Sequence, residues 1–266
     1  MAKVGIATIA LRRYDLHKAL DLSAQAGFEG VEIWGRPPHT PEVFERQYWE
    51  SVCEKLQELG LGISMFGSYI NPAWQDYKEK VSISLLASKV LGAKMLRVWA
   101  GNAEPKDASE DLWQHTIKAY KDLCKKAAYQ GLSLAIEMHP GTLCVSPEGS
   151  LRMLDEVGAS NLKLNYQVAY PAHADLEHDI ALAGPHIVNV HAQNFNSSEE
   201  EDGKYELSLI EEGMIDYRRL LELLQPHGFD GYVEVEFLKG EFTSEETMLD
   251  SLKQDAAYLR ELKSSF

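Results

Sequence analysis

Residues 132–167 read LSLAIEMHPGTLCVSPEGSLRMLDEVGASNLKLNYQ, and they hold one full unit of the pattern that decides the fold. The unit begins with a short apolar run, Leu132–His139, and the next such run is Leu162–Gln167. Short apolar runs of this length are typical of buried parallel strands. Between them, Ser146-Pro147 has the composition of a helix start, with serine as N-cap and proline as the first helical residue. The stretch therefore predicts a strand, a helix and a second, parallel strand.

The same alternation extends in both directions and covers the chain. Six further apolar runs are separated by longer amphipathic segments, and they are Val4–Ile9, Gly30–Trp34, Gly62–Ser68, Met95–Ala100, Ile187–Gln193 and Tyr232–Phe237. Eight strands that alternate with helices predict an α/β fold, a (β/α)8 TIM barrel, with residues 1–266 as a single domain. The alternative is an open doubly wound sheet. Against it, residues 9–14 after the first strand lack the glycine-rich turn that holds a dinucleotide.

Local patterns also predict where particular helices start. Apolar residues recur with a period near 3.6 over residues 43–59, and Thr40-Pro41 predicts the start of that helix. The segment Thr243-Ser-Glu-Glu246 has the composition of a capping box and predicts the start of the last helix.

The charge balance and the cysteines restrict the partners and the compartment. Asp and Glu number 41 and Lys and Arg 26, so the net charge is −15. Nucleic acids and anionic membranes are bound through clustered Lys and Arg, so neither is an expected partner. The three separated cysteines, Cys53, Cys124 and Cys144, are typical of a reducing compartment. No stretch reaches the ~18 apolar residues of a membrane span, and the first residues lack a signal-peptide layout. We expect a cytoplasmic protein that acts on a small molecule.

Polar residues stand at the ends of four consecutive predicted strands. In a barrel of this kind the active site lies at the carboxyl ends of the strands. Residues two positions apart share one face of a strand, so the polar residues form pairs that can point the same way. The pairs are Glu137 and His139, Asn165 and Gln167, His191 and Gln193, and Glu234 and Glu236. Pairs that face the barrel axis meet at its mouth.

Four of these residues make a mixed oxygen and nitrogen donor set. Glu137, Asn165, His191 and Glu236 offer carboxylate, amide and imidazole groups, which suit Mn²⁺, Mg²⁺, Co²⁺ or Zn²⁺. For each residue by itself, the alternative is a strand-end cap or a hydrogen bond to a neighbour. Their convergence from four strands favours a site for one divalent metal ion.

Several short motifs, taken together and in order, resemble the xylose isomerase-like TIM barrel superfamily, also called the sugar phosphate isomerase/epimerase family. They are the stretches 27–34, 91–98, 136–142, 212–217 and 228–236, and the resemblance covers nearly the whole chain. It implies a metal bound by Glu, Asp, His and Glu from strands five to eight. Carried over by position, these ligands are Glu137, Asn165, His191 and Glu236, the same set as above.

The chain departs from the family pattern near this set. Asn165 stands where an aspartate is usual, so one negative charge is lost, and either the metal is bound more weakly or Asn165 binds the substrate instead. Val168 stands where the family often has a histidine, and Gln193-Asn194 replaces a common Lys-Asp pair. We therefore expect a substrate pocket unlike that of the best-known ketose epimerases.

The resemblance implies metal-dependent isomerisation or epimerisation of a keto-sugar or polyol by proton transfer through an enediolate. Glu137 and Glu236 would be both metal ligands and the catalytic acid and base. Glu234 would hold one of the metal-binding side chains in position without binding the metal itself. Six further residues are expected to contact the substrate: His139, Gln167, Gln193, Trp34, Trp99 and Glu32.

Other outcomes stay open on the same scaffold. A dehydratase or a lyase would form the same enediolate. Because Asn165 replaces a charged ligand, a non-catalytic barrel that has lost its metal and binds a sugar or a partner is a further alternative. The DNA-repair endonucleases of the superfamily are excluded, because this chain has too few histidines at its strand ends. The acidic segment 196–203 is either a mobile lid or a solvated turn. Members of the family often form dimers or tetramers, so a homo-oligomer is also open.

Overall fold

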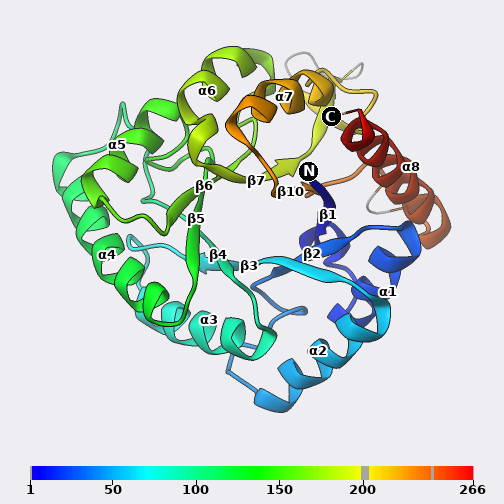
Figure 1. The fold of residues 1–266 in the computed structure, drawn as a ribbon, viewed down its shortest axis with the longest axis horizontal. Coiled ribbons are helices and arrows are strands. Elements are labelled where there is room, and N and C mark those ends of the chain that lie inside the picture. Colours follow the sequence, from blue (N-terminus) through cyan, green and yellow to red (C-terminus); the bar gives the residue numbers. More distant parts are fainter. Residues whose placement is uncertain (1, 199–203, 241–242, 266) are drawn as a thin grey trace.

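Each of the eight apolar runs forms a strand, and the strands close into a parallel barrel in a computed structural model that describes residues 2–198, 204–240 and 243–265 (Figure 1). β1 pairs with β2 on one side and with β10 on the other, so the sheet has no open edge and the predicted (β/α)8 barrel is confirmed. The barrel strands are β1 (Lys3–Ala7), β2 (Gly30–Trp34), β3 (Gly62–Ile70), β4 (Met95–Val98), β5 (Ser133–Glu137), β6 (Leu162–Tyr166), β7 (Ile187–Ala192) and β10 (Tyr232–Val235).

A ring of α-helices surrounds the strands (Figure 1). In the described part of the chain they are α1 (Leu16–Ala26), α2 (Arg46–Leu59), α3 (Tyr77–Leu91), α4 (Glu110–Tyr129), α5 (Pro147–Val157), α6 (Leu176–Ala183), α7 (Tyr217–Leu224) and α8 (Glu245–Ser264). The predicted start of α5 is confirmed, because the Ser146 side chain accepts a hydrogen bond from the Gly149 N–H. Within the described residues, none of these helices combines the length and the apolarity that crossing a bilayer requires.

Two predicted helix starts are wrong. α2 begins at Arg46 rather than after Thr40, whose hydroxyl instead donates to the Trp34 carbonyl oxygen at 2.8 Å and holds the loop after β2. α8 is capped by Ser244 rather than by Thr243, so the expected capping box lies one residue out of register. In both cases a neighbouring residue or a tertiary hydrogen bond overrides the local pattern.

The amino-terminal end of the barrel is filled by Tyr232. Gly30 and Gly62 face this ring, and a Cβ atom on them would lie 2.7 Å and 2.6 Å from atoms of Tyr232. Real Cβ atoms do not come so close, so both positions need glycine. The barrel is therefore packed at this end, and its polar interior lies toward the other end.

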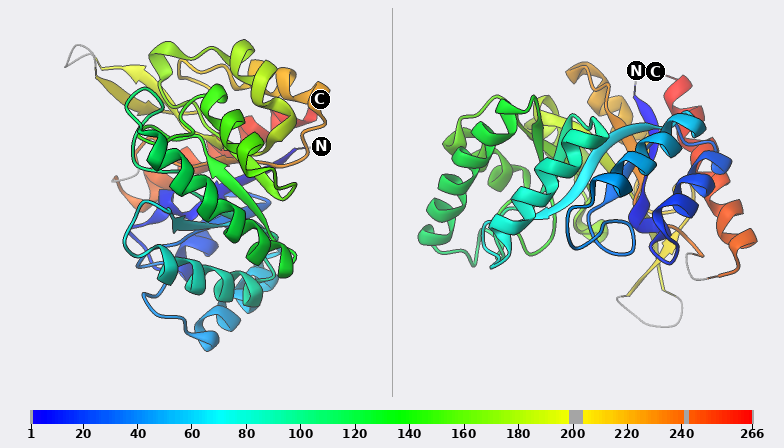
Figure 2. Two further views of the ribbon diagram at one scale, coloured as in Figure 1. Left: turned by 90° about the vertical axis from the view of Figure 1, so that its left-hand side faces the viewer. Right: turned by 90° about the horizontal axis from the view of Figure 1, so that it is seen from below.

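The chain after β7 forms a hairpin before it reaches α7. Its strands are β8 (Asn194–Ser197) and β9 (Tyr205–Ser208), which pair antiparallel. Asn194 anchors its base, because its Nδ2 donates to two backbone carbonyl oxygens. Figure 2 shows the hairpin projecting from the end of the molecule opposite to the two termini. Of the acidic segment 196–203, which we expected to be a lid or a turn, residues 196–198 belong to this hairpin and its end, and residues 199–203 lie outside the described residues.

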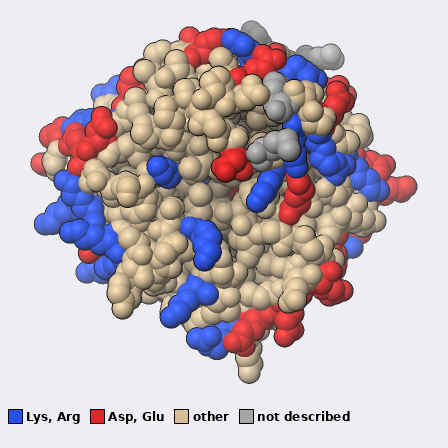
Figure 3. Space-filling model, in the orientation of Figure 1, with Lys and Arg blue, Asp and Glu red and all other residues tan. Residues whose placement is uncertain are grey.

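The face that carries both termini has no dominant charge. Figure 3 shows Lys and Arg interspersed with Asp and Glu around its edge, over the helices, and largely uncharged surface toward the middle. The described residues on this face thus offer no continuous basic surface of the kind that nucleic-acid binding requires.

Candidate active site

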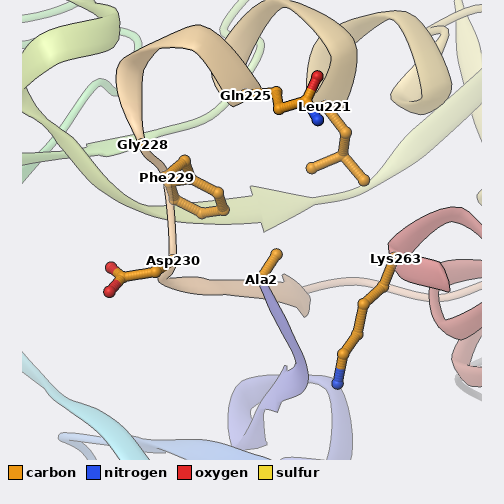
Figure 4. A pocket seen from close by; sticks show the side chains of 7 residues that line it. All are labelled: Ala2, Leu221, Gln225, Gly228, Phe229, Asp230 and Lys263. Carbon is orange, nitrogen blue, oxygen red and sulfur yellow. The ribbon is translucent and has the colours of Figure 1, made fainter. Parts of the chain in front are cut away.

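The barrel has a cavity near each of its ends. The cavity at the amino-terminal end holds about 210 Å³, and Figure 4 shows its Asp230 and Lys263 side chains well separated and pointing in different directions. Lys263 is already paired with Glu29 at 2.8 Å. The cavity at the carboxyl ends of the strands holds about 300 Å³. Since that is the end where barrels carry their chemistry, we treat it as the candidate active site.

The alternation of side chains along the strands brings most of the expected residues to this cavity. The outer member of each polar pair lines it, and the lining includes His139, Gln167, Gln193 and Glu236, together with Trp99. The inner members lie one step deeper, and they are Glu137, Asn165, His191 and Glu234, each at most 1% exposed.

Three residues from three strands meet at the floor of the cavity. The His191 Nδ1 atom lies 3.2 Å from Glu137 Oε1 and 3.3 Å from Glu236 Oε1. These three ligand atoms could hold one metal ion. Carboxylate oxygens and one imidazole nitrogen are donors that suit several divalent ions.

Glu32 orients the histidine of this cluster. The His191 Nε2 atom lies 2.7 Å from Glu32 Oε2, so a proton on Nε2 leaves the lone pair of Nδ1 facing the cluster. Such a carboxylate behind a histidine is the usual support of a metal-binding imidazole. Burial alone would lower the pKa of His191, but Glu236 and Glu32 raise it well above its usual value, so the cluster attracts positive charge.

Arg97, which the sequence analysis gave no role in the site, lies in the same layer. It is 2% exposed on β4, its Nε donates to Glu32 at 2.7 Å, and its Nη1 donates to Glu137. Gly67 on β3 makes room for the pair, since a Cβ atom there would collide with the Glu32 carboxylate. Burial would raise the pKa of Glu137, but Arg97 and His191 outweigh burial and hold it well below its usual range. Glu137 is thus kept ionised, with both its oxygens engaged.

Negative charge exceeds positive charge in this layer. Four buried carboxylates, on Glu32, Glu137, Glu234 and Glu236, face one guanidinium and one imidazole. Burial and the charge of Glu32 raise the pKa of Glu234 to about 7, and its oxygens accept from Ser64 and Asn189. Glu236 Oε2 is buried with no partner among the described residues. An excess of buried carboxylates with an unpaired oxygen fits a divalent cation.

Asn165 lies beside this cluster with one polar atom unpartnered. It pairs in register with Glu137 on the neighbouring strand, and its Oδ1 accepts from Asn189 at 3.0 Å. Its Nδ2 has no partner among the described residues. Whether its amide binds the metal or the substrate stays a prediction.

Aromatic and amide groups shape the cavity above the floor. His139 stacks on Trp99 at 4.2 Å between ring centroids, and its Nδ1 lies 2.7 Å from the Pro140 carbonyl oxygen. A proton on Nδ1 leaves Nε2 as the atom that can exchange protons. Gln193 donates to Gln167 at 3.2 Å, so the two amides form one polar wall.

Two of the expected substrate contacts lie elsewhere. Glu32 is 1% exposed and supports His191 and Arg97 from below, and Trp34 does not line the cavity but donates from its Nε1 to the Tyr69 hydroxyl at 2.7 Å. Tyr69 does line the cavity. The sequence does not indicate it, because the expected strand Gly62–Ser68 ends one residue before Tyr69, whereas β3 continues to Ile70. For Arg97 a signal existed: a charged residue inside the apolar run 95–100 requires a buried partner.

Comparison with known proteins gives both a family and relatives. The model of the family described as "xylose isomerase-like TIM barrel" matches residues 20–262. A 3-dehydroshikimate dehydratase from Bacillus anthracis is 24% identical over 208 residues, which are 74% of this chain and 73% of the relative.

Solved structures share the fold at lower identity. The crystal structure of AsbF from Bacillus anthracis matches with a TM-score of 0.79 and 21% identity, covering 97% of this chain and 98% of that chain. An L-ribulose 3-epimerase structure matches with a TM-score of 0.76 and 17% identity, covering 100% of this chain and 95% of that chain.

Proposed function

The chain belongs to the xylose isomerase-like TIM barrel family, and we propose that it is an enzyme that moves a proton at the carbon next to a carbonyl group of a small carbohydrate, as an isomerase or epimerase. The observation that carries the proposal is the buried Glu137–His191–Glu236 cluster under a cavity lined by hydroxyl-binding side chains. The relatives whose names give an activity include a 3-dehydroshikimate dehydratase and an L-ribulose 3-epimerase. A cytoplasmic location and a homo-oligomer remain predictions.

Glu137, His191 and Glu236 would hold one divalent metal ion, with Asn165 as a fourth ligand. When bound, such an ion polarises a carbonyl oxygen and makes the neighbouring C–H group more acidic. Glu32 and Arg97 position the ligands, since Glu32 fixes the imidazole and Arg97 fixes both Glu32 and Glu137.

Glu236 is the best-placed base. Glu236 lines the cavity, its Oε1 faces the cluster, and its Oε2 is buried with no partner among the described residues. Oε2 would take the proton from the carbon and, for an isomerisation, return it to the neighbouring carbon. An epimerisation would also require a second group on the opposite face of the sugar to deliver a proton to the first carbon. Gln167 and Gln193 would hold substrate hydroxyl groups, and the stacked rings of Trp99 and His139 would form one wall.

The first experiment measures proton exchange. Purified protein with Mn²⁺ is incubated in D₂O with ketoses, keto-inositols and 3-keto-sugars, and deuterium incorporation is followed by NMR. We expect exchange with at least one substrate, and E236Q should lower its rate at least about 100-fold, since a positioned base supplies about 10²–10⁴-fold. The matched control is E212Q, because Glu212 is half exposed and its one ion pair in the described part of the chain is with Lys239. Exchange that persists in E236Q contradicts the assignment of the base.

A dehydratase is the second candidate, and a specific feature favours it. Both oxygens of Glu137 are engaged by Arg97 and His191, so the proton-transfer group that faces Glu236 across the cavity is His139. An imidazole in that place can protonate a departing hydroxyl group, which turns the same first step into loss of water.

Product analysis separates the two candidates. An isomerase or epimerase gives a product of unchanged mass, whereas a dehydratase gives a product lighter by one water with a new carbon–carbon double bond. For the dehydratase we expect H139N to retain deuterium exchange and to lose product formation. A product of unchanged mass eliminates the dehydratase.

A further inference from the structure

Arg36 lies against Tyr69, one of the residues that line the active-site cavity. It follows β2, two residues beyond Trp34, and its guanidinium carbon lies 3.7 Å from the centroid of the Tyr69 ring. Tyr69 lines the cavity and is 8% exposed. Arg36 itself is exposed, so its side chain borders both the solvent and the wall of the cavity.

The stacked geometry leaves the hydrogen-bond donors of Arg36 available. Stacking uses the face of a guanidinium group, while its N–H groups point outward in the plane. The Tyr69 ring is fixed, because its hydroxyl accepts from Trp34 at 2.7 Å. Among the described residues, no carboxylate lies within ion-pair distance of Arg36, although Asp and Glu number 41 in the chain. An arginine stacked on a fixed ring, without an acidic partner among the described residues, is suited to bind an anionic group.

Two further arginines, Arg97 and Arg12, lie near this cavity. Arg97 lines its floor, and its Cζ lies 5.6 Å from the same Tyr69 ring. Arg12 lies 5.6 Å from the ring of Phe237, another lining residue, and it has further contacts of its own. Arg97 is neutralised by Glu32 and Glu137, so the inference depends only on Arg36.

We propose that the substrate of this site carries a carboxylate group, and that Arg36, stacked on Tyr69, binds this group and selects acidic over neutral substrates. The inference rests on the proposed function and narrows its substrate to a polyhydroxylated keto acid. A carboxylate is favoured because its two oxygens match the planar fork of a guanidinium group. A cavity of about 300 Å³ accommodates such a molecule.

The test compares polyhydroxylated ring compounds with and without an anionic group. Protein loaded with Mn²⁺ is titrated by calorimetry with quinate, myo-inositol and myo-inositol 1-phosphate, which are all polyhydroxylated six-membered rings. We expect quinate to bind at least about tenfold more tightly than myo-inositol, the preference that one charge-assisted bidentate pair supplies. R36Q should abolish this preference, and R36K should retain part of it. R46Q is the matched control, because Arg46 is exposed on α2 and weakly paired with Glu50.

Several binding results would overturn the proposal that Arg36 binds a substrate carboxylate. Equal binding of quinate and myo-inositol, an unchanged preference in R36Q, or no binding of any of the three ligands would contradict a carboxylate site at Arg36. Tighter binding of myo-inositol 1-phosphate than of quinate would replace the carboxylate with a phosphate. Failure of the proposed function is recognised separately, since the wild-type protein would then bind no Mn²⁺ and would exchange no deuterium.

Discussion

Arg97 explains how a full positive charge lies in the middle of the barrel. Its guanidinium group is 2% exposed and is neutralised by Glu32 and Glu137, which come from strands on either side. The same contacts fix the carboxylate of Glu137 and, through Glu32, the imidazole of His191. One residue therefore links the stability of the barrel to the geometry of the site.

Removing this charge should destabilise the protein strongly. R97M leaves Glu32 and Glu137 buried without their cation, and breaking a buried pair in this way costs about 3–5 kcal/mol. We expect the free energy of unfolding, measured by urea titration, to fall by that amount. The double variant E32Q/R97M should recover part of the loss, because one uncompensated carboxylate is gone. R97M as stable as the exposed control R46Q would contradict the account.

At the scale of elements, the start of α8 tests how the helix is capped. The side chain of Ser244 accepts from the Thr247 N–H at 3.2 Å, whereas the hydroxyl of Thr243 donates to the Gly240 carbonyl oxygen. Loss of an N-cap costs about 1 kcal/mol. We expect S244A to lower the free energy of unfolding by about this amount, and T243A to lower it by less. If urea titrations showed a larger loss for T243A than for S244A, the cap would be Thr243, as the sequence predicts.

A buried carboxylate on α8 also connects this helix to the chain segment that follows the β8–β9 hairpin. Asp255 is 1% exposed, its Oδ1 accepts from the Ile210 N–H at 2.7 Å, and its Oδ2 has no partner among the described residues. Burial raises the pKa of Asp255 to about 7, although the bond from Ile210 acts the other way. The folded protein thus binds a proton that the unfolded chain releases near its ordinary pKa of 3.8.

This difference in proton binding at Asp255 determines whether the stability of the protein rises or falls with pH. Between about pH 4 and about pH 7 the folded state holds more protons at Asp255 than the unfolded state, so its contribution to stability falls as the pH rises. We expect wild-type protein to lose stability relative to D255N over this interval, by at most about 4 kcal/mol at 1.36 kcal/mol per pKa unit, and to show no further loss above it. Urea midpoints at a series of pH values measure the difference. A constant difference would show that Asp255 ionises as it does in the unfolded chain.

At the scale of the whole molecule, the fold follows from the repeated pattern of short apolar runs and amphipathic segments, which local physical chemistry explains. Buried parallel strands are short and apolar, so runs such as Leu162–Gln167 are visible in the sequence, and their eightfold repetition leaves few topologies. The polar pairs at the strand ends were also predictable, because residues i and i+2 share a face of a strand.

Features that arise between strands were not predictable in the same way. Arg97 meets Glu32 and Glu137 only when β2, β4 and β5 are brought together by barrel closure. Glu32 was expected at the substrate for the same reason, since its burial under Arg97 and His191 is a tertiary effect. The sequence pattern predicts a helix cap at Thr40, whereas its hydrogen bond to Trp34 belongs to a loop that no periodicity describes.

The measurement that tests the central claim most directly is the position of a bound metal ion. Crystals of the protein grown with Mn²⁺ should show, by anomalous scattering at a manganese-sensitive wavelength, one peak per chain that is bonded to Glu137, His191 and Glu236. A peak bonded instead to Glu32, His191 and Glu234, the other buried triad that could hold an ion, would contradict the account, as would no peak in the barrel.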